Sequence, residues 1–155
     1  MANGEQPADN LIPVLYKYYM TMSLARQEFY KYLNEPDGHP AARPEADAAQ
    51  LGMEFLFSKA GIMMSYWYGM LCVVVDGWEQ TGLSDPEIDE MLKSPGKRKQ
   101  LWDFRNGVFH FQKELLSAKQ QPLFDERSFV PWVTTLSDAF KRRLIDEMRR
   151  LTKKP

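Results

Sequence analysis

Apolar side chains recur every three or four residues over most of the chain, a spacing typical of amphipathic helices rather than strands. The first such stretch covers residues 10–33, with Pro13 in its first turn, where proline is tolerated. Prolines and a glycine in residues 35–44 then predict a loop. The expected inward stripe of this first helix consists of Leu11, Val14, Leu15, Tyr18, Met22, Ala25, Phe29 and Leu33.

Residues 45–80 predict a second helix, interrupted at Gly52 or Gly61. It is apolar on nearly all faces after Gly61, as expected for the central helix of a bundle. The valines at 73–75 would also suit a short strand, but their flanks favour helix. The longest uncharged run, residues 60–75, spans 16 residues. Because a membrane span needs roughly 20, we expect a buried helix.

Three more helices are expected. Residues 85–92 form a short one, because Asp85 can cap it and Pro86 suits its first turn. The next covers residues 94–118 and the last residues 131–152. Their inward residues are Leu101, Phe104, Val108, Phe111 and Leu115, and then Val133, Leu136, Phe140, Leu144, Met148 and Leu151. The chain is therefore predicted to be all-α, an antiparallel bundle of four long helices and one short helix. This single domain would cover residues 10–155, after a flexible N-terminus at 1–9.

The composition limits the expected cellular compartment and the kinds of chemical site that the chain can form. The 155 residues include one cysteine, Cys72, which excludes an internal disulfide and a multi-cysteine zinc site. Its apolar surroundings favour a buried, inert thiol. The two histidines are far apart in the sequence, so we expect no metal and no other cofactor. The N-terminus lacks a basic segment followed by an apolar run, so we expect no signal peptide, no membrane association and a cytoplasmic location.

The net charge of -1 conceals an uneven distribution. Residues 1–92 carry a net charge of -9 and residues 93–155 a net charge of +8. This split suggests an anionic partner for the basic part, or two parts of the chain that attract each other, or both. Candidate contacts to RNA phosphates are Lys97, Arg98, Lys99, Lys141, Arg142 and Arg143. The alternative is a solvated basic face whose charges compensate the helix dipole.

The strongest candidate chemistry lies in residues 101–111, where Arg105, Asn106 and His110 fall within six residues. A histidine can move protons in RNA cleavage, and an arginine can stabilise the charged transition state without a metal. On an ideal helix Asp103, Asn106 and His110 share one line, so Asn106 could hydrogen-bond the His110 ring. Arg105 points about 140° away from His110, and a second copy of the helix could close that angle.

Other residues carry weaker signals. Gly107 costs about 1 kcal/mol relative to alanine inside a helix, so it suggests a local bend or the close approach of a phosphate, a partner helix or a neighbouring helix. His39 lies in the proline-rich loop, where a solvated histidine is the favoured interpretation. Trp78, Trp102 and Trp132 are expected in the core rather than as platforms for RNA bases.

The sequence Arg105-Asn106-Gly107-Val108-Phe109-His110, on a late helix of an all-α bundle, resembles the signature of the HEPN superfamily. Together with the order of helices, the resemblance covers most of residues 10–152. It implies a homodimer through the motif helix, with one composite cleft, and a metal-independent endoribonuclease of toxin–antitoxin, phage-defence or RNA-processing systems. His110 would be the general acid and base, Arg105 the phosphate clamp, and Asn106 the residue that orients His110 or the substrate. The implied partners are RNA and an antitoxin protein, and the implied products are a 2′,3′-cyclic phosphate and a 5′-hydroxyl.

This chain departs from some members of that family at one position. Some family toxins carry a tyrosine two residues after the motif histidine, which a partner antitoxin modifies, but here the residue is Gln112. That form of regulation is therefore not expected. Other members have lost catalysis, so the alternative function is a non-catalytic helical module that dimerises or binds a nucleotide or a protein partner.

Overall fold

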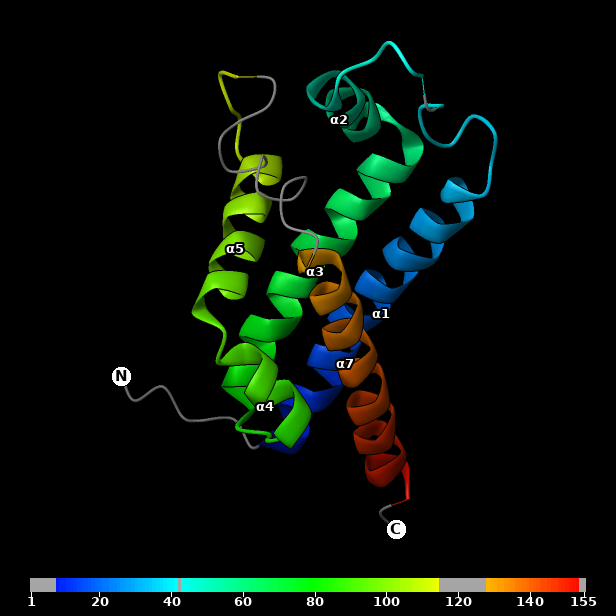
Figure 1. Ribbon diagram of the computed structural model, residues 1–155. Coiled ribbons are helices and arrows are strands. Elements are labelled where there is room, and N and C mark those ends of the chain that lie inside the picture. Colours follow the sequence, from blue (N-terminus) through cyan, green and yellow to red (C-terminus); the bar gives the residue numbers. More distant parts are fainter. Residues whose placement is uncertain (1–7, 42, 115–127, 154–155) are drawn as a thin grey trace.

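The computed structural model describes residues 8–41, 43–114 and 128–153 (Figure 1). Within these ranges it contains six helices and no strand, which confirms the all-α class. The helices are α1 (Ala8–Leu33), α2 (Ala48–Phe57), α3 (Lys59–Thr81), α4 (Pro86–Leu92), α5 (Pro95–Phe109) and α7 (Phe129–Thr152). The successive long helices α1, α3, α5 and α7 run in alternating directions along the bundle (Figure 1).

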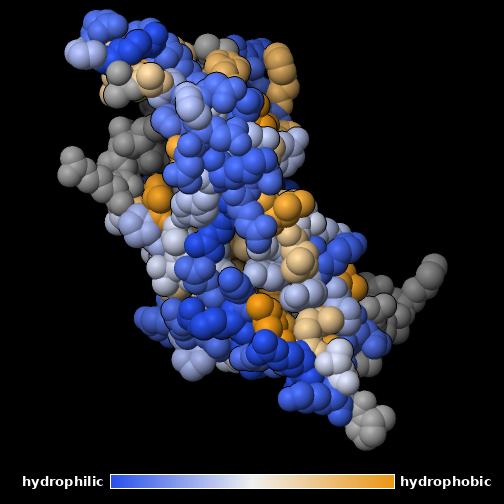
Figure 2. Space-filling view, turned by 90° about the vertical axis from the view of Figure 1, so that its right-hand side faces the viewer, coloured by the Kyte–Doolittle hydropathy of each residue, from blue (hydrophilic) through white to orange (hydrophobic). Residues whose placement is uncertain are grey.

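The central helix is α3, which contacts α1, α2 and α5. Trp67 and Tyr68 of α3 are fully buried, and the Trp67 Nε1–H donates a hydrogen bond to Ser137 Oγ of α7 at 3.0 Å. α3 is long and apolar enough to cross a membrane, but most of its apolar stretch is buried inside the bundle. The side of the molecule shown in Figure 2 is mainly hydrophilic, with small, separate hydrophobic areas. The apolar character of α3 therefore fits the core helix of a soluble protein.

The single helix predicted over residues 45–80 is two helices, separated at Ser58. Ser58 has extended backbone angles (φ -75°, ψ 161°). It is both the C-cap residue of α2 and the N-cap residue of α3. Its Oγ donates to the Phe55 carbonyl at 2.6 Å and accepts from the Gly61 N–H at 3.1 Å. A Cβ on Gly61 would lie 1.9 Å from the Phe55 carbonyl oxygen, so this sharp change of direction needs glycine there. The expected break at Gly52 or Gly61 thus lies a few residues before Gly61, and Gly52 is inside α2.

The buried face of α1 differs in part from the expected stripe. Val14 and Tyr18 were expected inside but are exposed, at 47% and 36%. The buried side chains of α1 are Ile12, Leu15, Tyr19, Met22, Ala25 and Phe29. α3 and α7 cover only one face of α1, but apolar residues also occur on the neighbouring, exposed face. The predicted stripe therefore mixed residues from the two faces. α1 also begins at Ala8, two residues before the expected start.

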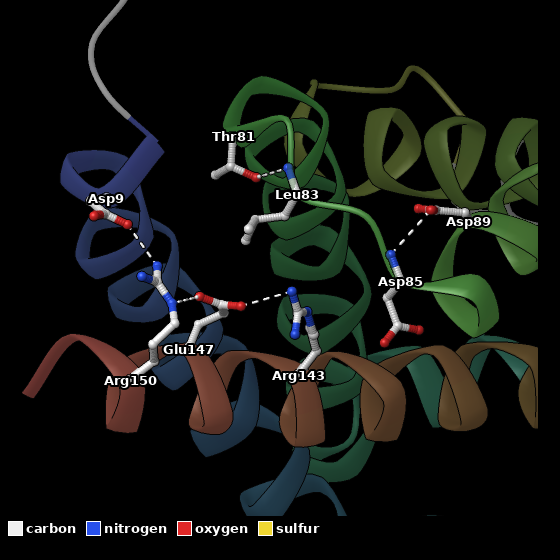
Figure 3. Close-up of polar contacts among 8 residues, drawn as sticks. All are labelled: Asp9, Thr81, Leu83, Asp85, Asp89, Arg143, Glu147 and Arg150. Carbon is white, nitrogen blue, oxygen red and sulfur yellow. Dashed lines mark hydrogen bonds and ion pairs between the residues drawn. The ribbon is translucent and has the colours of Figure 1, made fainter. Parts of the chain in front are cut away.

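The short helix α4 forms where the sequence predicts it. The Asp85 side chain accepts hydrogen bonds from two backbone N–H groups in the first turn, at 3.0 and 3.2 Å. The Asp85 N–H in turn donates to Asp89 Oδ2 at 3.1 Å (Figure 3). In the link from α3, Thr81 Oγ1 accepts from the Leu83 N–H at 3.2 Å (Figure 3). These local bonds explain why a capping aspartate followed by proline is a reliable signal here.

The last helix also follows the prediction closely. α7 begins at Phe129, two residues before the expected start at Pro131, and ends at Thr152 as expected. Its inward residues Val133, Leu136, Phe140 and Leu144 are buried, and Met148 and Leu151 are half-buried. The three- and four-residue spacing of the sequence therefore gives the correct inner face of α7.

Candidate active site at the end of α5

The end of α5 is not where the sequence predicts it. α5 stops at Phe109, and His110 has extended backbone angles (φ -114°, ψ 136°). The expected continuation of the helix through His110 and Phe111 is wrong, and residues 115–118 lie outside the described part of the chain. Phe111, expected on the inward stripe, is 95% exposed. The alignment of Asp103 and Asn106 with His110 on one helical face therefore does not exist.

Gln112 completes the hydrogen bonding at the end of α5. Its Nε2 donates to the backbone carbonyls of Asn106 (3.3 Å) and His110 (2.9 Å). The His110 N–H also donates to the Asn106 carbonyl, at 3.2 Å. The last carbonyls of a helix need such partners because no further turn provides N–H groups. Sequence reasoning missed this role of Gln112, although a glutamine after a mainly apolar run was the available signal.

Phe109 attaches the last turn of α5 to α3. Its ring lies directly over Gly69, where a Cβ would be only 2.0 Å from the ring carbon Cε2. Its edge also meets the Tyr66 ring, with 6.0 Å between the ring centroids. The sequence suggested that another group comes close to Gly107. The structure shows such a close contact at Gly69 of α3, and Gly107 itself is buried in α5. Since His110 follows Phe109 directly, this contact helps to determine where the histidine lies.

Arg105 lies between α5 and α3 and contacts its neighbour Asn106. The Arg105 Nη1 donates to Asn106 Oδ1 at 3.4 Å. Burial raises the pKa of Asp76 and raises the pKa of Cys72 to about 12, while the nearby Arg105 charge acts in the opposite direction on both α3 groups. Among the hydrogen bonds between described residues, none joins the Asn106 side chain to the His110 ring. Asn106 therefore orients Arg105 rather than the imidazole.

His110 is exposed and lines a hollow of about 350 Å³. The wall is formed by Phe57 at the end of α2 and by residues 107–114. Phe57 and Phe109, which are 66% and 47% exposed, line this hollow with Phe111 and the polar residues 112–114, so exposed apolar rings lie in the same wall as the histidine. An imidazole at such an open wall can exchange protons with a bound substrate.

The six basic residues predicted to contact RNA do not form one patch around His110. Five have partners within the chain: Lys97 with Ser128, Arg98 with Glu79 (2.9 Å), Lys99 with Asp103, Arg142 with Glu87, and Arg143 with Glu147 (2.7 Å). Lys141 lines a small polar pocket between α1 and α7. The basic residues 97–99 are in the first turns of α5, so they lie about 18 Å along the helix axis from His110.

Ion pairs within the molecule join its acidic and basic parts. Among the described residues, Arg98, Arg142 and Arg150 each pair with an acid from the first 92 residues. Figure 3 shows the pair of Arg150 with Asp9, at 2.6 Å, and its continuation to Glu147. Glu147 is only 5% exposed and accepts from Arg143 and Arg150, both at 2.7 Å. These contacts are the intramolecular attraction that the charge distribution suggested.

Within the described ranges, no cluster of three or more histidine, cysteine, aspartate or glutamate side chains could hold a metal ion. Cys72 is buried, as expected, and its Sγ lies 3.6 Å from the Leu101 carbonyl oxygen. Comparison of the chain with known protein families, characterised proteins and solved structures found no match. What points to a function is therefore the Arg105–His110 motif and the geometry at the end of α5.

Proposed function

We propose that the protein is a HEPN-type endoribonuclease that cleaves RNA without a metal and works as a homodimer in the cytoplasm. The observation that carries this proposal is the exposed His110 at the wall of a hollow, directly after a helix whose last two turns contain the Arg105–Asn106 pair. The last turn of that helix is fixed to α3 by the Phe109 ring. A proton-transfer group and a permanent cation are thus held on one rigid support.

The proposed reaction uses the RNA 2′-hydroxyl as the nucleophile. One His110 accepts the proton of this hydroxyl while the 2′ oxygen attacks the adjacent phosphorus. Arg105 stabilises the negative charge that develops on the phosphoryl oxygens. The bond from phosphorus to the 5′ oxygen breaks, and a second His110 gives that oxygen a proton. The products are a 2′,3′-cyclic phosphate and a 5′-hydroxyl.

One copy of the chain does not bring the two groups together. The Arg105 charge acts on Asp76 of α3, whereas His110 lines the hollow, and a step of five residues corresponds to about 7.5 Å along a helix axis. A second copy packed on the exposed rings of Phe57, Phe109 and Phe111 would shield this apolar surface from water. It would also supply the opposing histidine, which makes the cleft a shared one.

The proposed biological role is that of a toxin or phage-defence nuclease, with an antitoxin protein as its regulator. RNA binding by the basic residues of α5 and α7 requires that they exchange their acidic partners for phosphates. For the exposed pairs this exchange has a small cost, because such pairs contribute only about 0–1 kcal/mol each, whereas Arg143 pairs with the buried Glu147 and is expected to keep that partner. Arg142 and Glu87, for example, are both well exposed. RNA affinity should therefore fall steeply with added salt.

A second candidate function is a non-catalytic helical module that dimerises and binds a protein partner. The effect of the Arg105 charge on Asp76 favours it, because that charge lowers the pKa of a half-buried carboxyl group and so has a structural use in the fold. This module would keep the exposed aromatic surface around His110 and lack any turnover.

Cleavage of RNA in the presence of EDTA distinguishes the two candidates. We expect the purified protein to cut a pool of single-stranded RNAs and to leave 2′,3′-cyclic phosphate ends. His110→Ala should lower the rate by about 100-fold or more, as for loss of a general acid or base. Because His110 is exposed, the free energy of unfolding of the variant should lie within about 0.5 kcal/mol of the wild-type value.

Asp103→Asn is the matched control, since Asp103 lies on the same helix and pairs with Lys99 rather than with the motif. Its cleavage rate should stay within about twofold of wild type, as expected for loss of a surface ion pair. Absence of cleavage in any RNA pool, or equal cleavage by wild type and His110→Ala, would contradict the nuclease and leave the non-catalytic module as the function.

A further inference from the structure

A second hollow shares no lining residue with the one at His110. It is open to solvent, has a volume of about 700 Å³ and is lined by the end of α1, the loop after it, α2, α3 and the first turn of α7. Its floor is buried and consists of Phe29, Met64 and Tyr68. The remaining lining residues are His39, Pro40, Ala48, Leu51, Gly52, Phe55 and Val130. A cavity of this size falls within the range of about 300–1,000 Å³ that is typical of small-molecule sites.

Polar contacts outside the hollow keep its walls apart. The break at Ser58 turns α2 away from the axis of α3. The loop after α1 is attached to the start of α3 by the ion pair of Asp37 with Lys59 (2.8 Å) and by the Ala60 N–H, which donates to the Gly38 carbonyl at 2.9 Å. The two sides of the hollow are therefore held by bonds that do not depend on filling it. A space with supported walls is a preformed site rather than a packing fault.

The lining specifies what the hollow can hold. None of the described residues that line it is an aspartate, glutamate, lysine or arginine, so it offers no permanent counterion to a phosphate or a carboxylate. Leu51 and Phe55 are one turn apart on α2, and both remain only partly buried although they face the hollow. Such apolar surface is stabilised by an apolar occupant, at roughly 25 cal/mol per Å² removed from water.

One polar group in the lining has a defined role. His39 Nδ1 lies 3.1 Å from the Pro40 carbonyl oxygen. Because a carbonyl oxygen can only accept, Nδ1 carries a proton, and whenever the ring is neutral Nε2 is therefore an acceptor. The site therefore favours a ligand that offers one hydrogen-bond donor.

We propose that this hollow binds a neutral, mainly aromatic small molecule that carries one hydroxyl or N–H group. The ligand ring system packs on Phe29, Met64 and Phe55, and its donor bonds to Nε2 of His39. The site is distinct from the proposed nuclease site, since no residue lines both this hollow and the one at His110.

Two nearly isosteric probes test the proposal on the full-length protein. 2-Naphthol has one donor, and 2-methoxynaphthalene replaces it with a methyl ether. We expect 2-naphthol to bind saturably with one site per chain, and to bind at least about fivefold more tightly than the ether, as for loss of one hydrogen bond. Titration by NMR chemical shifts measures both affinities.

Two alanines of α2 provide a matched pair of variants. Both are exposed, but Ala48 lines the hollow, whereas Ala49, the next residue, does not. Ala48→Trp should fill part of the space and weaken 2-naphthol binding at least about tenfold, while Ala49→Trp should bind within about twofold of wild type. His39→Phe keeps an aromatic ring but lacks the acceptor, so it should abolish the preference for 2-naphthol over the ether.

Several results would overturn the proposal. Absence of saturable binding of both probes to wild type up to about 1 mM shows that the hollow is not a site of useful affinity. Equal weakening by Ala48→Trp and Ala49→Trp places the probes elsewhere. Equal affinity of wild type for 2-naphthol and its ether, or an unchanged preference in His39→Phe, contradicts the assigned role of His39. Because no step uses His110, these outcomes are independent of RNA cleavage.

Discussion

Replacing Gly69 with alanine tests whether the Phe109 ring holds the end of α5 on α3. The new Cβ would lie 2.0 Å from Cε2 and 2.7 Å from Cζ of Phe109, so the ring must move away. Phe109 is 47% exposed, and full burial of a phenylalanine is worth roughly 1.5–3 kcal/mol, so about 1–1.5 kcal/mol of packing is lost. Alanine favours a helix over glycine by about 0.5–1 kcal/mol. The net loss of stability for Gly69→Ala should thus be about 1 kcal/mol or less.

A double-mutant cycle separates the two effects. In the Phe109→Ala background the ring is absent, so Gly69→Ala should stabilise the protein by about 0.5–1 kcal/mol. The effect of the same change therefore differs by about 1–1.5 kcal/mol between the two backgrounds. Urea unfolding of the four proteins, followed by circular dichroism, measures this coupling. Thermal melts provide a check, since 1 kcal/mol corresponds to about 2–4 °C in a domain of this size.

Gly77→Ala is the control, because Gly77 is on the same helix but its Cβ would meet the flexible Leu15 Cδ1 at 2.8 Å. It should show no coupling to Phe109→Ala, since the two sites share no partner. If Gly69→Ala stabilises the wild-type protein as much as the Phe109→Ala protein, the ring does not sit on Gly69. The proposed role of the Phe109–Gly69 contact in positioning His110 would then be wrong.

Further outcomes follow from buried groups. Glu147→Gln should cost about 1–3 kcal/mol in urea unfolding, because the buried carboxylate accepts from two arginines, whereas exposed Asp146→Asn should change stability little. Burial raises the pKa of Asp76 in the folded protein above the value of about 3.9 in the unfolded chain. The free energy of unfolding should therefore fall as the pH rises from the unfolded pKa through the folded pKa, because the folded protein holds this proton more tightly. Asp76→Asn should accordingly gain stability over wild type above that window and not below it, which unfolding at a series of pH values will show. The Cys72 thiol, buried and with its pKa raised to about 12, should react with a thiol reagent only after denaturant is added.

The all-α class and the positions of α4 and α7 were predictable from local sequence, whereas the lengths of the other helices were predicted less well. α4 follows from Asp85 and Pro86, because a capping side chain and a proline act within one turn. The inner face of α7 follows from its regular spacing, since one side of the helix is polar. The break at Ser58 was not predictable in the same way. It depends on a hydroxyl that bonds on both sides and on a loop carbonyl, that of Gly38, which takes up the Ala60 N–H.

The candidate site was found by its residue types but not by its geometry. The apolar spacing continues through Phe111, so a pattern alone extends the helix past its real end. The end of α5 is determined by the hydrogen bonds of Gln112 and by the packing of the Phe109 ring on Gly69, which lies 40 positions earlier in the chain. Contacts over such a distance in sequence leave no periodic signal. The orientation of Arg105 toward α3 could not be obtained from an ideal helix for the same reason.

The most direct test of the shared catalytic cleft is the RNA cleavage rate of wild-type protein co-refolded with His110→Ala in known proportions. If each cleft needs a histidine from both copies, the rate per total protein should follow the square of the wild-type fraction. An equal mixture would then retain about one quarter of the wild-type rate. A rate that falls in direct proportion to the wild-type fraction, leaving about one half in the equal mixture, would contradict the composite cleft, because each chain would then act alone. Absence of cleavage at every proportion would contradict the nuclease itself.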